Sequence, residues 1–425
     1  MTTTSTDASL TIDGLEEPPP LVKGTLRRLL GWIIPTNISI FIIWGAVPGL
    51  LLPLQVAGID PVNKIANIAV VMTVSAFAAM LAQPIAGLLS DRTRSRFGRR
   101  AQWMVGGVLI GGLALIGMAM ASTLVQIGIA WVIVQVAYNF TQGPLSAILP
   151  DRVPRAARGT FSAMAGLGSM LGALGGQIVG SIFFSKNIPT GYMFFAGLAL
   201  VVITLFVVFN PDHSSVDNER EPFSLKVFLG TFWVSPKKHP DFFWAFTGRL
   251  LLYTGYFAVT GFQLYILSDY IGLGLDGAAA AIPIFGLSSL AGIIISTLVS
   301  GPLSDKLGRR KIFVFISSVV VGLALLIPMI MPTFEGWLIF SIVSGLGFGC
   351  FSAVDQALMS EVLPSKDSFA KDLGVVNIAA TLPQTLAPGL AGAVVLAFGY
   401  VGLFPIGIIL SILGAFAVWF IKAVK

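Results

Sequence analysis

The sequence predicts an all-α membrane protein with twelve transmembrane helices, arranged as two pseudo-symmetric six-helix bundles. Three observations lead to this prediction: the composition, a series of twelve long apolar stretches, and an internal repeat. The 425 residues are 55% hydrophobic and only 11% charged, whereas about a quarter of the residues in a soluble domain are charged. A helix that crosses a bilayer needs about 20 apolar residues. Twelve such helices with short connections account for the whole chain.

The apolar stretches favour helices over the strands of a barrel, because barrel strands need only about 10 residues and alternate with polar ones. The predicted spans are 31–54, 66–90, 102–122, 125–149, 160–184, 190–209, 242–268, 277–302, 312–331, 334–359, 372–396 and 399–421. The longest polar segment divides them into two sets of six. The expected organisation is a flexible tail at 1–30, a bundle at 31–210, a linker at 211–241, a second bundle at 242–421 and a short end at 422–425.

The basic residues predict the orientation of these spans. Of the 26 Lys and Arg residues, 23 lie in the tails or in loops on one side of the predicted membrane. Lys64 and Lys186 lie on the other side, and Arg249 lies inside a span. Because cytoplasmic loops carry the excess of basic residues, both termini are expected in the cytoplasm and the protein in the plasma membrane. The net charge of +6 is therefore a topology signal, and no nucleic-acid partner is expected.

The two predicted bundles share short sequences at corresponding places. The segment 87–92 (GLLSDR) followed by 98–100 (GRR) corresponds to 301–306 (GPLSDK) followed by 308–310 (GRR). Farther along, 149–154 (LPDRVP) corresponds to 359–364 (MSEVLP). The offsets of 214 and 210 residues are nearly constant, which indicates a duplicated six-helix unit. Two such halves with a cavity between them form one known transporter plan.

These repeated loops resemble the signature of the major facilitator superfamily. The longer first copy, 90–100, is similar to the glycoside–pentoside–hexuronide cation symporters and the related sucrose–proton symporters, as is Gln142-Gly143-Pro144 followed by Asp151. The resemblance implies a secondary active transporter that works by alternating access and imports a sugar or glycoside together with a proton. Spans 1 and 2 lack the acidic residues that melibiose-type members use for sodium, so a proton is the expected coupling ion.

The signature loops are expected to form a cytoplasmic latch. Their carboxylates lie at helix ends, where they can interact with the dipole of a neighbouring helix. Their arginines can pair with acidic residues at the ends of spans 4 and 10. The residues assigned to this latch, largely from the resemblance, are Gly87, Asp91, Arg92, Gly98, Arg99, Arg100, Asp151, Arg158, Asp305, Gly308, Arg309, Arg310 and Glu361.

Polar residues inside the spans predict the substrate cavity, because polar groups in a membrane are costly and tend to face a cavity or one another. Spans 4, 7 and 10 carry such residues at helical spacing, and the resemblance adds span 1. The residues expected to line the cavity are Asn37, Trp44, Gln135, Tyr138, Asn139, Gln142, Arg249, Tyr253, Tyr256, Gln263, Ser352, Asp355, Asn377 and Gln384. Aromatic rings with amides suit a sugar, although interhelical hydrogen bonding is the alternative interpretation.

Arg249 and Asp355 are expected to form an ion pair that couples the ion to the substrate. They enter the membrane from the same side to similar depths, roughly 12 and 9 Å at 1.5 Å per residue, and an unpaired charge there is expensive. Protonation of Asp355, or engagement of Arg249 by substrate, would break the pair. A static structural pair is the alternative. Asp269, at the outer end of span 7, is a second candidate proton site, and solvation at the interface is its alternative.

Stripes of small residues suggest close helix contacts. Span 5 carries Gly168, Gly172, Gly176 and Gly180, and span 8 carries Gly292, Ser296 and Ser300. Small residues let helices approach closely. Because spans 5 and 8 cross between the halves in the resembled family, these stripes are expected at the moving contacts, with ordinary tight packing as the alternative.

Proton-driven efflux of drugs or metabolites is the second candidate function, favoured by the apolar, Met-rich and Phe-rich composition. An enzyme is not expected, because the chain has no Gly-Lys dipeptide for a phosphate loop and no metalloprotease or hydrolase motif. The single cysteine, Cys350, and the two histidines, His213 and His239, argue against a disulfide or a metal site. No cofactor is expected, and the partners are a small-molecule substrate, a proton and the lipid bilayer.

Overall fold

The computed structural model describes residues 23–154, 157–216, 236–362 and 369–422, and within these ranges not the side chains of Ser360 and 369–380. In the described residues the secondary structure is helical throughout. Eleven helices are long and apolar enough to cross a membrane, and a bent pair makes a twelfth span. The predicted twelve-helix architecture is confirmed, with helices that extend several residues beyond many of the apolar stretches.

The N-terminal half begins with one long span. It consists of α1 (Gly24–Ala46), the π-helical segment η1 (Val47–Leu51) and α2 (Leu52–Ile59). The half continues with α3 (Lys64–Arg92), α4 (Ala101–Met120), α5 (Leu124–Arg152), α6 (Arg158–Val179), the π-helical segment η3 (Gly180–Phe184) and α7 (Ile188–Phe209).

The C-terminal half begins with the bent span. In it, α9 (Pro240–Thr260) is followed after a 44° bend by α10 (Gln263–Tyr265) and the π-helical segment η4 (Ile266–Tyr270). The half continues with α11 (Gly274–Leu307), α12 (Arg310–Ala324), α13 (Leu326–Ile330), α14 (Phe334–Glu361), α15 (Phe369–Phe398), the 3₁₀ turn η5 (Tyr400–Gly402) and α16 (Leu403–Trp419).

The predicted tail boundary was partly wrong. Residues 24–30, expected in the flexible tail, form the first turns of α1, because Leu29 is buried while Arg27 and Arg28 face outward. Residues 1–22 of the predicted tail and 217–235 of the predicted linker lie outside the described residues.

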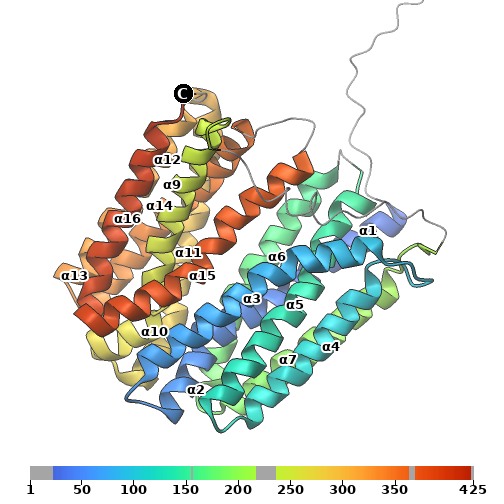
Figure 1. The fold of residues 1–425 in the computed structure, drawn as a ribbon, viewed down its shortest axis with the longest axis horizontal. Coiled ribbons are helices and arrows are strands. Elements are labelled where there is room, and N and C mark those ends of the chain that lie inside the picture. Colours follow the sequence, from blue (N-terminus) through green and yellow to red (C-terminus); the bar gives the residue numbers. More distant parts are fainter. Residues whose placement is uncertain (1–22, 155–156, 217–235, 363–368, 423–425) are drawn as a thin grey trace, which may run out of the picture.

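The two halves repeat one pattern of helix packing, as the sequence repeat predicts. In the N-terminal half α1 packs against α6 and α7, α3 against α5, and α4 against α5 and α7. In the C-terminal half the corresponding pairs are α9 with α15 and α16, α11 with α14, and α12 with α14 and α16. The halves lie side by side in Figure 1, and the loops after Arg92 and Leu307 lie at one end, called the basic end below.

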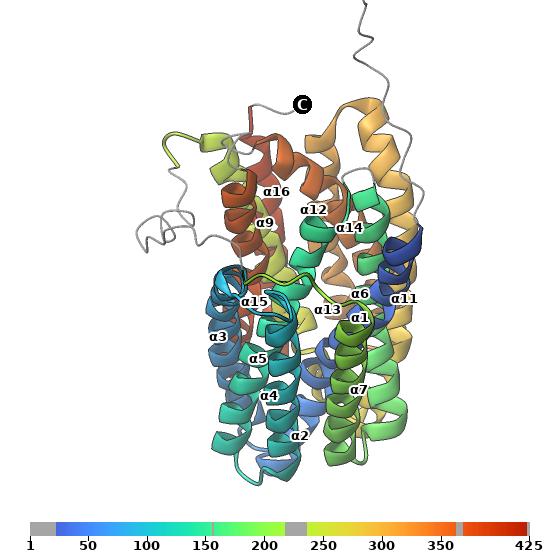
Figure 2. The same cartoon turned by 90° about the vertical axis from the view of Figure 1, so that its right-hand side faces the viewer.

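Two seams join the halves: α3 packs against α15, and α6 against α11. On the first seam, a Cβ atom on Gly392 would lie 2.3 Å from the Cβ of Ala69, so the helices touch there through glycine. On the second seam, the Ser181 hydroxyl donates to the Ala279 carbonyl at 2.7 Å. Ala69 and Ala279 lie near the starts of α3 and α11. Both helices start at the end opposite the basic loops, where α2 is also found (Figures 1 and 2).

The glycine stripes lie elsewhere than expected. A Cβ atom on Gly168, Gly172 or Gly176 would come within 2.1 to 2.9 Å of a backbone oxygen of α1, so this stripe packs α6 against α1 inside the N-terminal half. Gly292 similarly approaches α14 inside the C-terminal half. These contacts fit the tight-packing interpretation, because the nearest atoms to these four glycines belong to the same half of the molecule. Neighbouring helices within a bundle also need small residues to pack closely, and the sequence does not say which neighbour a stripe meets.

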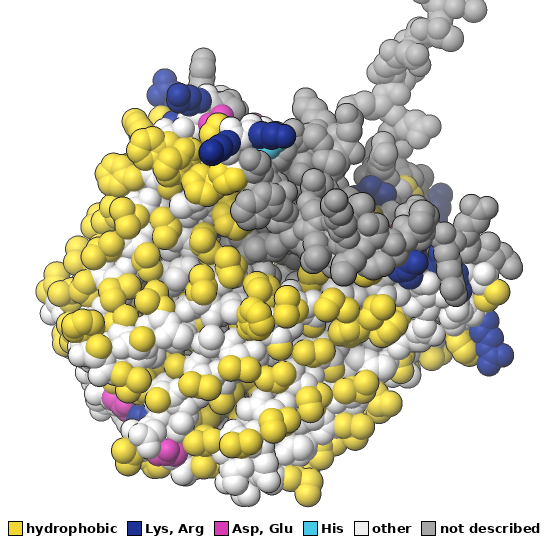
Figure 3. Space-filling view, viewed as in Figure 1, with side chains coloured by type: hydrophobic (Ala, Val, Ile, Leu, Met, Phe, Trp, Pro, Cys, Tyr) yellow, Lys and Arg dark blue, Asp and Glu magenta, His cyan; other side chains and the backbone are white. Residues whose placement is uncertain are grey.

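The flank of the molecule is apolar. Large hydrophobic side chains such as Val74, Phe77, Ile295, Leu298 and Phe416 are more than half exposed. In Figure 3 hydrophobic and uncharged groups cover this flank, and the charged side chains that are visible lie near the two ends. A soluble protein rarely exposes so continuous an apolar surface. The chain is therefore a multi-pass integral membrane protein whose flank faces lipid.

Candidate substrate cavity and ion-pair clusters

Arg249 of α9 and Asp355 of α14 meet inside the C-terminal half, as the sequence predicts. Nε and Nη2 of Arg249 lie 2.6 and 2.5 Å from the same carboxylate oxygen of Asp355. The two side chains are only 5% and 2% exposed. Nη2 also donates to Oε1 of Gln356 at 3.2 Å. The guanidinium therefore binds an anionic and a neutral acceptor on one helix. The helical spacing of the polar residues did not predict Gln356 as a neighbour of Arg249.

An aromatic cluster continues from this pair along α9 and α14. The ring of Tyr256 stacks on Phe348, with centroids 4.5 Å apart and planes 19° apart, and Tyr253 lies 5.6 Å from both Phe348 and Phe351. Ser352 follows Phe351 on α14 and lies close to Tyr253. The predicted polar faces of spans 7 and 10 therefore meet, with the charged pair at one end and aromatic rings and hydroxyls beside it.

Gln263 is separated from this face. The sequence places it on a single helical stripe with Arg249, but α9 ends at Thr260 and the span bends by 44° before α10 begins at Gln263. At the bend, the backbone N–H groups of Gly261 and Phe262 donate to the carbonyls of Phe257 and Val259. The prediction of one continuous face through Gln263 was wrong.

In the N-terminal half, one contact joins two predicted cavity residues. Nε1 of Trp44 in α1 donates to Oε1 of Gln142 in α5 at 3.3 Å. Both side chains are partly exposed, as is that of Gln135. This ring and these amides are therefore less buried than the other predicted cavity residues described in this half.

Three other predicted cavity residues are packed inside the half. The amide of Asn37 donates to the Ile33 carbonyl of its own helix at 2.8 Å, and Asn139 donates to Gln135 in the same way. Tyr138 is fully buried, with its ring against Gly111 of α4. In this conformation the two amides satisfy themselves within their own helices, which fits the alternative interpretation of hydrogen bonding without a solute. Gln384 is exposed on α15, and the Asn377 side chain lies outside the described residues.

A cavity of about 720 Å³ opens on the α3–α15 seam. Its walls are apolar apart from threonines, and none of the predicted cavity residues lines it. The lining residues are Thr73, Val74, Phe77, Thr254, Thr385, Leu386, Gly389 and Leu390. Val74, Phe77 and Leu386 are strongly exposed on the flank, and Thr254 follows Tyr253 on α9. The cavity therefore reaches from the membrane face to the level of the aromatic cluster.

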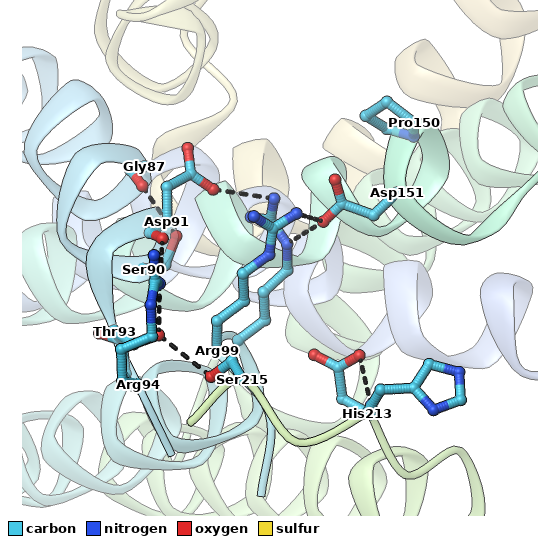
Figure 4. Close-up of polar contacts among 12 residues, drawn as sticks. Gly87, Ser90, Asp91, Thr93, Arg94, Arg99, Pro150, Asp151, His213 and Ser215 are labelled. Carbon is cyan, nitrogen blue, oxygen red and sulfur yellow. Dashed lines mark hydrogen bonds and ion pairs between the residues drawn. The ribbon is translucent and has the colours of Figure 1, made fainter. Parts of the chain in front are cut away.

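The signature loops form one ion-pair cluster in each half. In the first, Arg100 lies between two carboxylates, with Nη2 3.0 Å from Asp91 and Nε 2.5 Å from Asp151, while Arg99 lies 2.8 Å from Asp151 (Figure 4). In the second, Arg310 pairs with Asp305 at 2.7 Å and with Glu361. The central arginine, the acid of the loop and the acid of the next even-numbered span occupy equivalent places in the repeat.

The two signature glycines adopt the backbone conformation that the loops require. Gly98 has φ +85° and Gly308 has φ +60°, a region that residues with a side chain rarely adopt. Gly98 also lies so close to Asp212 that a Cβ atom would clash with it. Both glycines therefore turn the chain sharply between the helix end and the arginines.

The other residues assigned to the latch have local contacts. Arg158 donates to the carbonyls of Val153 and Pro150 at 3.1 and 2.8 Å, so it caps the end of α5. Gly87 lies beside Gly143 of α5. Arg92 is half-buried and Arg309 is exposed at the start of α12.

The longer first loop also binds the start of the linker. The hydroxyl of Ser215 donates to the carbonyl of Thr93 at 3.1 Å (Figure 4). The same hydroxyl accepts from the backbone N–H of Ser95 at 3.0 Å. The backbone N–H of Ser215 donates to the Ser95 carbonyl at 3.1 Å. The extra residues therefore hold the chain that leaves α7 against the N-terminal half.

At the opposite end, Asp269 pairs with Lys64 across the halves at 2.7 Å. The turn before Lys64 is held by Asp60, whose carboxylate accepts from the backbone N–H of Asn63 at 3.0 Å. This hydrogen bond and those from the Asn63 and Asn67 side chains lower the pKa of Asp60. Asp269 was singled out from the sequence, but its partner on span 2 was not.

Two pseudo-symmetric helical bundles, with a charged pair and polar rings buried between membrane-facing walls, define a polytopic transporter. A family model for the Major Facilitator Superfamily matches residues 33–297 and 285–425. The chain belongs to this superfamily and is a transporter rather than an enzyme. The resemblance that the signature loops indicate is confirmed.

Individual relatives differ in the solutes that their names state. A sucrose transport protein of Arabidopsis thaliana is 26% identical over 386 residues, which cover 73% of this chain and 73% of that protein. A multidrug resistance protein of Shewanella oneidensis is 29% identical over 158 residues, covering 37% of this chain and 38% of that protein. Among solved structures, the nucleoside transporter NupG has the same fold, with a TM-score of 0.72 and 18% identity, over 92% of this chain and 99% of that one.

Proposed function

We propose that the protein imports a neutral sugar or glycoside together with a proton, by alternating access across the plasma membrane, with the basic end in the cytoplasm. The observation that carries this proposal is the buried pair of Arg249 and Asp355 beside Tyr253 and Tyr256. The pair has no net charge, and rings with hydroxyls and amides match the alternating apolar and polar surfaces of a sugar. The relative named as a sucrose transporter supports the same substrate class.

Coupling follows from the chemistry of the pair. A proton on Asp355 removes the charge that holds Arg249, and the guanidinium is then free to donate to a hydroxyl of the substrate. Loss of the proton restores the pair and expels the solute. Gln356 supplies a neutral acceptor that keeps Arg249 in place while Asp355 is protonated.

A direct test uses the purified protein in liposomes that contain a pH dye. A panel of mono- and disaccharides is added outside, and internal acidification is followed for the wild type and for Asp355→Asn. The expected result is acidification with one class of sugar, and its loss in the variant while uptake of labelled sugar down its own gradient persists. Acidification by the variant equal to that of the wild type would move coupling to another group.

Proton-driven efflux of drugs or metabolites is the second candidate. The apolar cavity on the α3–α15 seam favours it, because a compound dissolved in the bilayer could enter there. A relative named as a multidrug resistance protein points the same way. If no sugar acidifies the liposomes, a panel of lipophilic cations under an imposed proton gradient distinguishes the two functions.

The signature clusters are proposed to act as a latch at the cytoplasmic end. Asp91 lies at the end of α3, which shares a seam with α15, and Asp305 lies at the end of α11, which shares a seam with α6. Movement that brings the basic ends together carries each carboxylate toward the first turn of its seam partner. A carboxylate at a helix N-terminus is stabilised by the helix dipole.

Asp91→Asn is therefore expected to leave membrane insertion unchanged and to slow transport roughly fivefold, since a contact of this kind is worth on the order of 1 kcal/mol. The measurement is the initial rate of uptake per inserted protein. Arg96→Gln, in the same loop but with an exposed side chain, is the matched control and should transport at the wild-type rate. A wild-type transport rate in Asp91→Asn would contradict the proposal that Asp91 is part of a latch.

A further inference from the structure

Polar contacts join the two halves at the end opposite the basic loops. Lys64, the first residue of α3, places Nζ 2.8 Å from Oδ1 and 2.7 Å from Oδ2 of Asp269 in η4. The hydroxyl of Tyr265, one turn earlier in the same bent span, donates to the Pro53 carbonyl of α2 at 2.8 Å. Both contacts connect the C-terminal half to the N-terminal half.

Asp269 is the centre of this cluster. Its carboxylate also accepts from the hydroxyl of Tyr400 at 2.7 Å and from that of Ser268 at 2.9 Å. The ammonium of Lys64 lies 5.1 Å from the centre of the Tyr265 ring, so it gains from the ring electrons as well. An ion pair within such a network is held more firmly than an isolated surface pair.

The exposure of the pair suits a contact that must break and re-form. The side chains of Lys64 and Asp269 are 16% and 29% exposed, whereas those of Arg249 and Asp355 are 5% and 2% exposed. Separated ions at a membrane surface regain water at little cost, but separated ions in the interior do not. The outer pair can therefore open without the penalty of an unpaired buried charge.

The local backbone supports movement of the Asp269 segment. The span bends by 44° after Thr260, and Asp269 lies in the π-helical segment beyond the bend. The seam contact between Ser181 and Ala279 lies at the same end. Opening this end of the molecule requires that η4 separate from the start of α3.

We propose that Lys64 and Asp269 form the gate that closes the transport pathway at the end opposite the basic loops, with Tyr400 and Tyr265 as its supports. The gate holds the present conformation, and its release exposes the pathway at that end. In this role Asp269 holds Lys64, and with it the start of α3, in the closed position. The role does not require Asp269 to carry the coupling proton.

The test uses a cysteine reporter and needs no substrate, so its outcome is independent of the proposed function. In a Cys350→Ser background, which removes the single native thiol, Ser181→Cys places a thiol at a buried site of η3, where it contacts α11. The rate of maleimide labelling in detergent then reports how often this end opens. Lys64→Ala and Asp269→Asn are each expected to label about fivefold faster, the lower end of typical coupling effects.

The charge swap Lys64→Asp/Asp269→Lys is expected to return labelling toward the rate of the parent. Lys186→Ala and Asp276→Asn are matched controls, because both residues are exposed at the same end, and neither should change the rate. Gel filtration verifies that each variant is folded, and Lys64→Gln replaces Lys64→Ala if the latter is not recovered. Two results would contradict the proposed gate: a labelling rate in Asp269→Asn equal to that of the parent, or a labelling rate in the charge-swap variant as high as in the single variants.

Discussion

Arg249→Ala is expected to destabilise the protein severely and to abolish coupled transport. The substitution leaves the carboxylate of Asp355, only 2% exposed, without its cation. Removing one partner of a buried ion pair typically costs about 3–5 kcal/mol. Because transport also needs Arg249 to engage the substrate, coupled uptake should be lost. Thermal unfolding in detergent and uptake in liposomes measure the two effects.

Two further variants separate charge from packing at this site. Arg249→Ala/Asp355→Ala removes both charges, and it should recover much of the stability while remaining inactive. Arg249→Lys retains the charge, but an ammonium group cannot contact Asp355 and Gln356 in the way that a planar guanidinium does. This variant should therefore fold, and its transport rate should be low. If Arg249→Ala unfolded at the wild-type temperature, the pair would contribute nothing to stability.

Gly176→Leu is expected to prevent correct assembly of the N-terminal half. A Cβ atom at this position would lie 2.1 Å from the carbonyl oxygen of Ile42, so any side chain forces α6 away from α1. The penalty exceeds that of ordinary overpacking, about 1–3 kcal/mol, because the obstacle is backbone. The measurement is the fraction of protein that elutes as a single species in gel filtration, which should fall to near zero.

Gly175→Leu is the matched control for this substitution. Its Cβ atom would have no neighbour within 4 Å, so the same change one residue earlier should leave the elution profile unchanged. Equal behaviour of the two variants would contradict the packing of α1 on α6.

Several parts of the site could be predicted from residues alone. The pairing of Arg249 with Asp355 follows from depth and from the cost of an unpaired charge in a membrane, and both arguments require only counting along helices. The ion pairs of the signature loops follow in the same way from the repeat, since equivalent residues in a duplicated unit occupy equivalent places.

The differences between the sequence-based expectations and the structure share a physical cause. Residue type and spacing singled out Asn37 and Asn139, but hydrogen bonds within one helix decide where their side chains lie in this conformation. A break of the helix after Thr260 moves Gln263 off the stripe. Lys64 and Tyr400 meet Asp269 from other helices, and such contacts between distant segments leave no periodic signal.

The sequence by itself determined the class of fold, the number of spans, the duplication and the buried charged pair, because hydropathy, charge and repeats are properties of residues along one chain. The tertiary structure decided which helix each stripe packs against, which amides remain free, and which ions join the two halves. Those outcomes depend on how the helices rotate and cross. The rotation of each helix is set by its packing against all of its neighbours at once, so the sequence of one helix does not specify it.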